Sequence, residues 1–271
     1  MDRAVTWESR QWRLEWSDEF DGAAGSPANS ANWIIEIGSF GADHHELQYY
    51  CDRRENVALD GKGNLAITAR EGNPGNDDCH YGKCRYTSAR LSTRERVMAI
   101  YGRIEARIQI PRGQGIWPAF WMVGSQHDKG VWDVSGEIDI MENIGKEPRA
   151  IHGTLHGPGY YGGGGIGRVY SLSKPFADDF HVYAIDWDAD AIRWYVDGTM
   201  FHKVTPDDLR GNPWLFNHAF YINLNVAVGG HWAGEPDATS VFPQTMLVDY
   251  VRIWKLAEPN TYRGTYSVPT R

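Results

Sequence analysis

Three carboxylic acids lie close together in the segment GEIDIMENIG, residues 136–145: Glu137, Asp139 and Glu142. Apolar residues separate them, so the segment has the composition of a strand that is buried on one face. Two neighbouring carboxyl groups, one protonated and one ionised, can serve as a general acid and as a nucleophile or base in hydrolysis. The alternative is a solvated acidic face on the outside of a sheet, and the acids alone do not decide between the two.

The spacing of the acids predicts an irregular strand. Side chains alternate along a strand, so Glu137 and Asp139 share one face while Ile138 points into the core. A regular continuation would put Glu142 on the core face, where an unpaired glutamate is costly. One extra residue, a β-bulge near Met141, returns Glu142 to the face of the other two acids.

The bulge also predicts how far apart the two glutamates are. With the bulge absorbed, their Cα atoms are about four strand steps apart, or roughly 13 Å at about 3.3 Å per residue. Side chains that lean together would bring the carboxyl groups of Glu137 and Glu142 to about 5 Å, near the spacing of retaining rather than inverting glycosidases. Three acids this close cannot all ionise readily, so one should keep its proton near neutral pH.

Composition favours an all-β protein. The chain has 271 residues, of which 42% are hydrophobic and 13% aromatic, with 30 glycines and 13 prolines. Aromatic residues suit pleated strands, and glycine suits tight turns. The net charge of −8 argues against nucleic acid or an anionic membrane as partner. No apolar run reaches the roughly 18 residues that a membrane-spanning helix needs.

Alternating apolar and polar residues recur along the chain, with turn signals between them. We expect a hairpin over 57–70, a strand over 101–110, three strands over 181–204, and further strands over 220–230 and 245–255. The only helical candidate is PDDLR, 206–210. Many antiparallel strands without helical crossovers predict a β-jelly-roll sandwich of two antiparallel sheets. We expect one domain over 1–255 and a C-terminal tail over 256–271.

Residues around the acid strand suggest a carbohydrate site. Trp117 and Trp121 are four residues apart in GIWPAFWMVG and therefore share a strand face, with small Ala119 between them. An isolated pair of this kind is more often core, but flat aromatic rings beside acids also suit stacking on sugars. His152 and His156 share a face too, although this spacing on a strand is poor for metal chelation. The glycine run 162–165 predicts a mobile rim.

The cysteines and the N-terminus bear on location. Cys79 and Cys84 close the short loop CHYGKC and either form a disulfide or remain free thiols, with Cys51 left over. The loop has poor spacing for zinc. MDRAVTWESRQWRLEW lacks the apolar segment of a signal peptide. The protein is therefore either cytoplasmic or secreted with a leader that is missing from this sequence.

The whole chain resembles family sixteen of the glycoside hydrolases, and within it the bacterial laminarinases, which are endo-β-1,3-glucanases. The motifs that carry the resemblance are WSDEFDG (16–22), ELQYY (46–50), YTSARLST (86–93), GIWPAFWM, GEIDIMENIG, HGTLHGPG, NLNVAVGGHW (223–232) and VDYVRIW (248–254). The resemblance implies a jelly roll with a concave, Trp-lined substrate cleft. It also implies double displacement with retention, in which Glu137 is the nucleophile, Glu142 the acid/base and Asp139 an assistant to the nucleophile.

The resemblance implies further roles outside the acid strand. The implied sugar-binding residues are Arg90, Trp117, Trp121, His156, Asn225 and Trp232. Trp232 follows GGH where many relatives have GGN, a departure at the neighbouring subsite. No cofactor is expected for catalysis. Because the relatives act on external polysaccharide, the resemblance favours secretion, and we expect a monomer that binds β-1,3-glucan.

A structural calcium ion is also implied by the resemblance. The matching positions are Glu19, the backbone carbonyl of Gly61, and Asp249. Oxygen ligands from separate strands suit a hard cation. For Asp249 the alternative is an ordinary outward-facing strand residue.

Three other functions stay open at this point. The chain could be a non-catalytic β-glucan-binding protein, although such relatives lack the two glutamates that are present here. It could act on a related polymer such as a mixed-linkage β-1,3-1,4-glucan or a galactan, although enzymes specific for mixed-linkage glucan usually show the unbulged ExDxE spacing. It could be a metal-dependent hydrolase built on the acids and His156.

Overall fold

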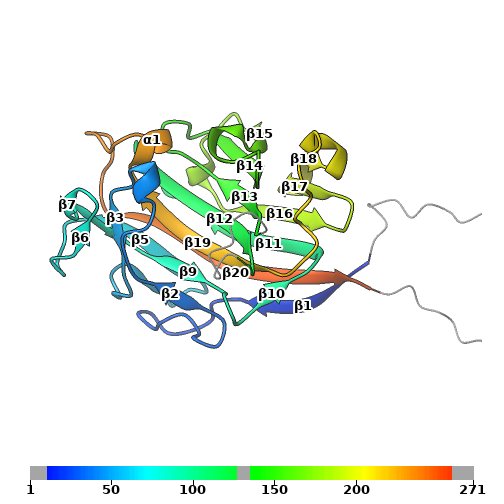
Figure 1. The fold of residues 1–271 in the computed structure, drawn as a ribbon. Coiled ribbons are helices and arrows are strands. Elements are labelled where there is room, and N and C mark those ends of the chain that lie inside the picture. The colour runs from blue at the N-terminus through cyan, green and yellow to red at the C-terminus, as the bar shows by residue number, and fades with distance from the viewer. Residues whose placement is uncertain (1–10, 127–134, 258–271) are drawn as a thin grey trace, which may run out of the picture.

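The protein is a β-jelly-roll sandwich of two large, mainly antiparallel sheets (Figure 1). The structure, a computed structural model, describes residues 11–126 and 135–257. The first sheet has ten strands, ordered β18-β17-β16-β11-β20-β5-β8-β3, with β1 beside β20 and β4 beside β5. The second has eight, ordered β15-β14-β13-β12-β19-β9-β2, with β10 beside β19. Within the described residues only β3 and β8 pair in parallel. The predicted fold class is confirmed.

The strands of the ten-stranded sheet are β1 (Trp12–Asp18), β3 (Gln48–Tyr50), β4 (Val57–Leu59), β5 (Leu65–Glu71), β8 (Tyr86–Ser88), β11 (Gly102–Gln109), β16 (His181–Trp187), β17 (Ile192–Val196), β18 (Thr199–Val204) and β20 (Gln244–Leu256). Those of the eight-stranded sheet are β2 (Ile34–Glu36), β9 (Arg90–Ser92), β10 (Met98–Ala99), β12 (Ile116–Gly124), β13 (Glu137–Glu142), β14 (Ala150–His156), β15 (Ile166–Ser171) and β19 (Phe220–Val228). A small hairpin pairs β6 (Asp78–Cys79) with β7 (Gly82–Lys83).

Helical segments are few and short. The α-helix α1 covers Gly230–Ala233, and 3₁₀ turns cover η2 (Ala42–His44), η5 (Gly162–Gly164), η6 (Phe176–Asp178) and η7 (Pro206–Leu209). The predicted helical segment 206–210 is confirmed as η7. It begins with a capping box formed by Thr205 and Asp208. Among the described residues, no helix has the length and apolarity to cross a membrane.

The strands follow the alternation of the sequence. In β11, Ile104, Ala106 and Ile108 are all fully buried, whereas Arg103 and Arg107 on the other face keep partial exposure. Apolar side chains from both sheets meet in one buried cluster, to which β12 contributes Phe120. The predicted hairpin over 57–70, the three strands over 181–204 and the two later strands all form. The last strand continues to Leu256, one residue into the predicted tail, and the tail beyond 257 lies outside the described residues.

The disulfide is present. Cys79 and Cys84 are bonded across the β6–β7 hairpin, and Cys51 is a buried free thiol. The Tyr81 hydroxyl, at the tip of this hairpin, donates to the backbone oxygen of Leu47 at 2.6 Å. The hairpin is therefore held against the segment that leads into β3.

Candidate active site

The acid strand β13 lies between β12 and β14 in the eight-stranded sheet, and it is bulged. Trp121 of β12 pairs with Asp139, but the preceding β12 residue pairs with Met141, so Ile140 is the extra residue. The pairing with β14 shifts in the same place, between Asp139 and Glu142. The predicted bulge next to Met141 is confirmed.

The bulge turns two successive side chains into the core and the acids outward. Ile140 and Met141 are 1% and 0% exposed and both belong to the buried cluster. A regular strand would send one of them to each face. Glu137, Asp139 and Glu142 instead line one cleft on the other face of the sheet.

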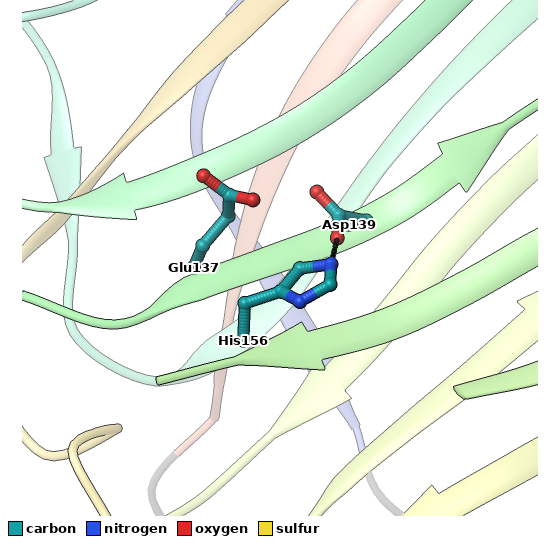
Figure 2. Close-up of side chains that lie close together, drawn as sticks. All are labelled: Glu137, Asp139 and His156. Atoms are coloured by element: carbon teal, nitrogen blue, oxygen red, sulfur yellow. Dashed lines mark ion pairs between the residues drawn. The ribbon is translucent and has the colours of Figure 1, made fainter. Parts of the chain in front are cut away.

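The side chains of Glu142 and Asp139 are each oriented by a neighbouring side chain. The indole Nε1 of Trp117 donates a hydrogen bond to Glu142 Oε1 at 3.0 Å. His156 Nε2 lies 3.0 Å from Asp139 Oδ2, and Figure 2 shows this contact reaching from β14 to β13, with Glu137 on the same strand as Asp139. Asp139 is only 4% exposed, so its carboxyl is oriented by this contact with the imidazole.

Burial raises the pKa of all three acids. The pKa of Glu137 rises to about 8, first because the group is buried and second because Asp139 adds a like charge. Burial also raises the pKa of Asp139 to about 8. The pKa of Glu142 lies well above its usual range, again through burial first and the charge of Asp139 second. The cluster therefore holds at least one proton at neutral pH, which supplies a general acid, as predicted.

These shifts make protein stability depend on pH in a defined direction. A carboxyl whose pKa is higher in the folded state keeps its proton between its unfolded pKa, about 4.3, and its folded pKa, about 8 for Glu137. The folded protein then binds more protons than the unfolded chain, so this group lowers stability as pH rises through that window. Above about pH 8 Glu137 is ionised in the folded and the unfolded protein, and the full free-energy cost of burying its charge is present.

We therefore expect Glu137→Gln to stabilise the protein at pH 9 by at least about 1.4 kcal/mol, the free energy of one pKa unit. At pH 4.5 the gain should be close to zero, since a protonated carboxyl and an amide are similar in size and charge. Urea unfolding of both proteins at the two pH values measures this. An equal gain at pH 4.5 and pH 9 would show that charge burial is not its origin.

Aromatic and polar side chains complete the cleft. Arg90 of β9 lies over the Trp121 ring at 4.7 Å, and its Nε lies 2.6 Å from Glu36 of β2. The Trp121 indole donates to Asn225 Oδ1 at 2.7 Å, and the Asn225 amide donates to the Tyr50 hydroxyl at 3.2 Å. The orientations of the arginine and of the indole are thus set by neighbours rather than by substrate.

The structure brings the predicted sugar-binding residues to one region. Arg90, Trp117, Trp121 and Asn225 line the cleft with the acids. His156 reaches it through Asp139, and Trp232 packs edge-on against Trp117 with ring centroids 5.1 Å apart. Their contacts with sugar stay a prediction.

Seven further residues line the cleft that were not predicted as site residues: Phe40, Gly41, His44, Glu46, Tyr50, Ala119 and Ala227. Glu46 accepts a hydrogen bond from the Gln48 side chain at 2.6 Å, and burial raises its pKa. The segment ELQYY is one of the motifs that carry the family resemblance, and its glutamate, Glu46, is the sequence feature that could have indicated a site residue there. What the sequence does not show is that this segment meets β19 through a bridge between Glu46 and Gly229.

Two groups of residues bear on metal binding. One ligand atom each from Glu137, Asp139 and His156 lies within 4.8 Å of the others, an arrangement that a cation could use. At the predicted calcium position, Glu19 instead holds Arg252 through two contacts of 2.9 and 2.7 Å, and Asp249 lies 2.7 Å from Arg107. Gly61 lies in the β4–β5 turn. Calcium binding there stays a prediction.

The arrangement suits acid-assisted displacement at a sugar. Glu137 and Glu142 stand at the two ends of the bulged strand and face one cleft, with Asp139 between them. The indoles of Trp117 and Trp121 stand beside them on β12. One protonated and one ionised glutamate, flanked by flat apolar rings, provide a proton for a leaving oxygen and a nucleophile for an anomeric carbon.

Comparison with known proteins agrees with this chemistry. A β-glucanase from Rhodothermus marinus is 40% identical over 256 residues, covering 91% of this chain and 86% of that protein. The structure of an endo-β-1,3-glucanase from Pyrococcus furiosus superposes with a TM-score of 0.85 at 45% identity, covering 93% of this chain and 98% of that one. The structure of the laminarinase catalytic domain from Thermotoga maritima superposes with a TM-score of 0.83 at 43% identity, covering 91% of this chain and 99% of that one.

Residues 45–264 match the sequence profile of the glycosyl hydrolases family 16. That stretch contains the bulged acid strand, both cleft tryptophans and Asn225. The chain belongs to family 16 of the glycosyl hydrolases.

Proposed function

We propose that the protein is an endo-acting β-1,3-glucanase that retains anomeric configuration through a covalent glycosyl-enzyme. The observation that carries the proposal is the bulged strand β13, which puts Glu137 and Glu142 on one face of an aromatic cleft. Similarity to laminarinases over nine-tenths of the chain supports the substrate class.

In the first step, Glu142 donates its proton to the leaving glycosidic oxygen while the Glu137 carboxylate attacks the anomeric carbon. The carbon–oxygen bond breaks and an ester to Glu137 forms. In the second step, Glu142 takes a proton from water, and this water attacks the same carbon and releases Glu137. Asp139, between the two glutamates, raises the pKa of both by its charge and so helps to retain the proton that the first step needs.

A three-substrate comparison tests the proposal. Laminarin should be cleaved fastest, a mixed-linkage β-1,3-1,4-glucan more slowly, and cellulose not at all. Chromatography of early products separates endo from exo action, since endo cleavage releases a ladder of oligosaccharides. Faster turnover of cellulose than of laminarin would contradict the assignment, and binding of laminarin without any product would favour a glucan-binding protein.

Trp121 offers a test of the cleft itself. Trp121→Ala removes a ring that lies half-exposed beside the acids and against Arg90. The lost stacking should raise KM for laminarin by about 5- to 150-fold, equivalent to about 1–3 kcal/mol by analogy with base stacking on aromatics. The melting temperature should change little, whereas loss of a core tryptophan would cost about 3–5 kcal/mol of stability. A large fall in melting temperature would show that the ring is structural.

We also propose a structural calcium ion at Glu19, Gly61 and Asp249, because relatives of this type often carry one on the convex face. Glu19 contacts Arg252 and Asp249 contacts Arg107, so calcium would compete with two arginines for these carboxylates. Chelator should then lower the melting temperature of calcium-loaded protein by several degrees and leave turnover at moderate temperature intact. Immediate loss of turnover in folded protein would indicate a catalytic metal instead.

Secretion and a monomeric state complete the proposal. The disulfide Cys79–Cys84 supports an oxidising location. Recovery of the oxidised protein from culture medium tests the location, and light scattering tests for a species of 30.6 kDa.

A further inference from the structure

Three histidines from separate segments gather at one end of the cleft. His45 follows η2, His80 lies in the turn of the β6–β7 hairpin, and His231 lies in α1. The ring centroids of His45 and His231 are 4.1 Å apart, and those of His45 and His80 are 5.7 Å apart. All three side chains are exposed. In Figure 1 the β6–β7 hairpin and α1 lie at the same end of the molecule.

Backbone contacts hold these three segments together. A bridge joins Glu46, the residue after His45, to Gly229, which precedes α1. The hairpin is closed by the Cys79–Cys84 disulfide and tied to Leu47 by the Tyr81 hydroxyl. The approach of the imidazoles is therefore imposed by the fold, and it does not depend on the rings attracting one another.

The spacing suits a shared metal ion. Imidazole nitrogen binds Zn²⁺ at about 2.0–2.1 Å, which puts the ring centroid about 3.2 Å from the ion. Two such rings at an angle of 90–110° have centroids about 4.5–5.2 Å apart. The two observed distances, 4.1 and 5.7 Å, bracket this range. The ring nitrogens of the three histidines do not all lie within 4.8 Å of one another, so the exposed side chains must rotate to share an ion. Exposed side chains change rotamer in nanoseconds or less.

The donor set selects the kind of ion. Three neutral imidazoles favour Zn²⁺, Ni²⁺ or Cu²⁺, whereas Ca²⁺ and Mg²⁺ require oxygen ligands.

The cluster also lies beside the cleft. His44, next to His45, has its ring 6.5 Å from that of Trp117, and Trp232, next to His231, packs against the same indole. An ion on the cluster would connect the segments that frame Trp117.

We propose that His45, His80 and His231 form a binding site for one divalent transition-metal ion of the zinc class, separate from the catalytic acids. Three protein ligands leave at least one coordination position for water. The ion would join η2, the disulfide hairpin and α1 and stabilise this end of the cleft. The site does not depend on the glucanase activity.

The experiment must separate this site from Glu137, Asp139 and His156, whose ligand atoms already lie close together. Titration calorimetry with Zn²⁺ at pH 7.5 is therefore done on Glu137→Gln, on Glu137→Gln/His80→Ala, and on Glu137→Gln/Lys83→Ala. Lys83 is the matched control, since it is exposed on the same hairpin and has no imidazole. His80 does not line the cleft that holds the acids, so His80→Ala alone should keep full turnover without metal.

Glu137→Gln and its Lys83→Ala derivative should bind one zinc ion with equal affinity. His80→Ala should weaken that binding at least about tenfold, because changes even outside the ligand shell cost 10–100-fold. His231→Asn should weaken binding in the same way, because it removes another of the three imidazole ligands. Equal binding by the His80→Ala and Lys83→Ala proteins, or no binding by Glu137→Gln, would overturn the proposal.

Discussion

Glu137→Ala should lower laminarin hydrolysis by at least about 10⁴-fold, because loss of a covalent nucleophile removes both steps of the reaction. Glu137 lies in the cleft at the start of β13, and its removal leaves Glu142 and the aromatic residues in place. Initial rates on laminarin measure the effect. Glu147→Ala is the control, since Glu147 is an exposed acid just beyond the same strand, and it should keep most of the activity.

Azide gives this prediction a second outcome. With a substrate that has a good leaving group, azide can occupy the space left by the Glu137 carboxylate and attack the anomeric carbon once. The product should be the α-glycosyl azide, since a single displacement inverts the configuration. A β-glycosyl azide from this variant would mean that another group still forms the glycosyl-enzyme, and Glu137 would lose its role.

Glu142→Ala should lower laminarin hydrolysis by about 10²–10⁴-fold, the usual contribution of general acid–base catalysis. The effect should be much smaller in the first step with an activated aryl glycoside, whose leaving group needs no proton. The glycosyl-enzyme on Glu137 should then accumulate, because no base activates water. Rapid-mixing measurement of aryl release would show a burst followed by slow turnover.

Azide should rescue this variant with the opposite stereochemistry. It attacks the glycosyl-enzyme from the face that Glu142 vacates, and two displacements give the β-glycosyl azide. Trp117→Phe is a matched control, because it keeps a ring but removes the indole donor to Glu142. That hydrogen bond favours the ionised form, so its loss should raise the pKa of Glu142 further and should not produce azide rescue. Equal losses with activated and natural substrates in Glu142→Ala would contradict its acid/base role.

The acid strand shows how far local sequence patterns reach. The bulge was predictable because a buried, unpaired glutamate is costly, and the structure confirms it with Ile140 and Met141 both in the core. The fold class was predictable because alternation with period two recurs from β4 to β20. Both inferences need only neighbouring residues and the chemistry of burial.

Contacts between distant segments could not be predicted in the same way. Glu46 and Tyr50 reach the cleft because a short segment at β3 meets β19, and the Tyr50–Asn225 hydrogen bond between them spans 175 residues of sequence. The histidine cluster has the same origin, since His45, His80 and His231 share no periodic pattern. At the proposed calcium position, motif matching did not indicate the arginines that contact Glu19 and Asp249.

The anomeric configuration of the first product tests the central claim most directly. Proton NMR of laminarin digestion by the unmodified protein, recorded before mutarotation, distinguishes the two anomers of the new reducing end. Two displacements, by Glu137 and then by water activated by Glu142, predict that the β-anomer appears first and the α-anomer grows in later. Initial release of the α-anomer would contradict the nucleophile, the acid/base and the short carboxyl separation inferred from the bulged strand.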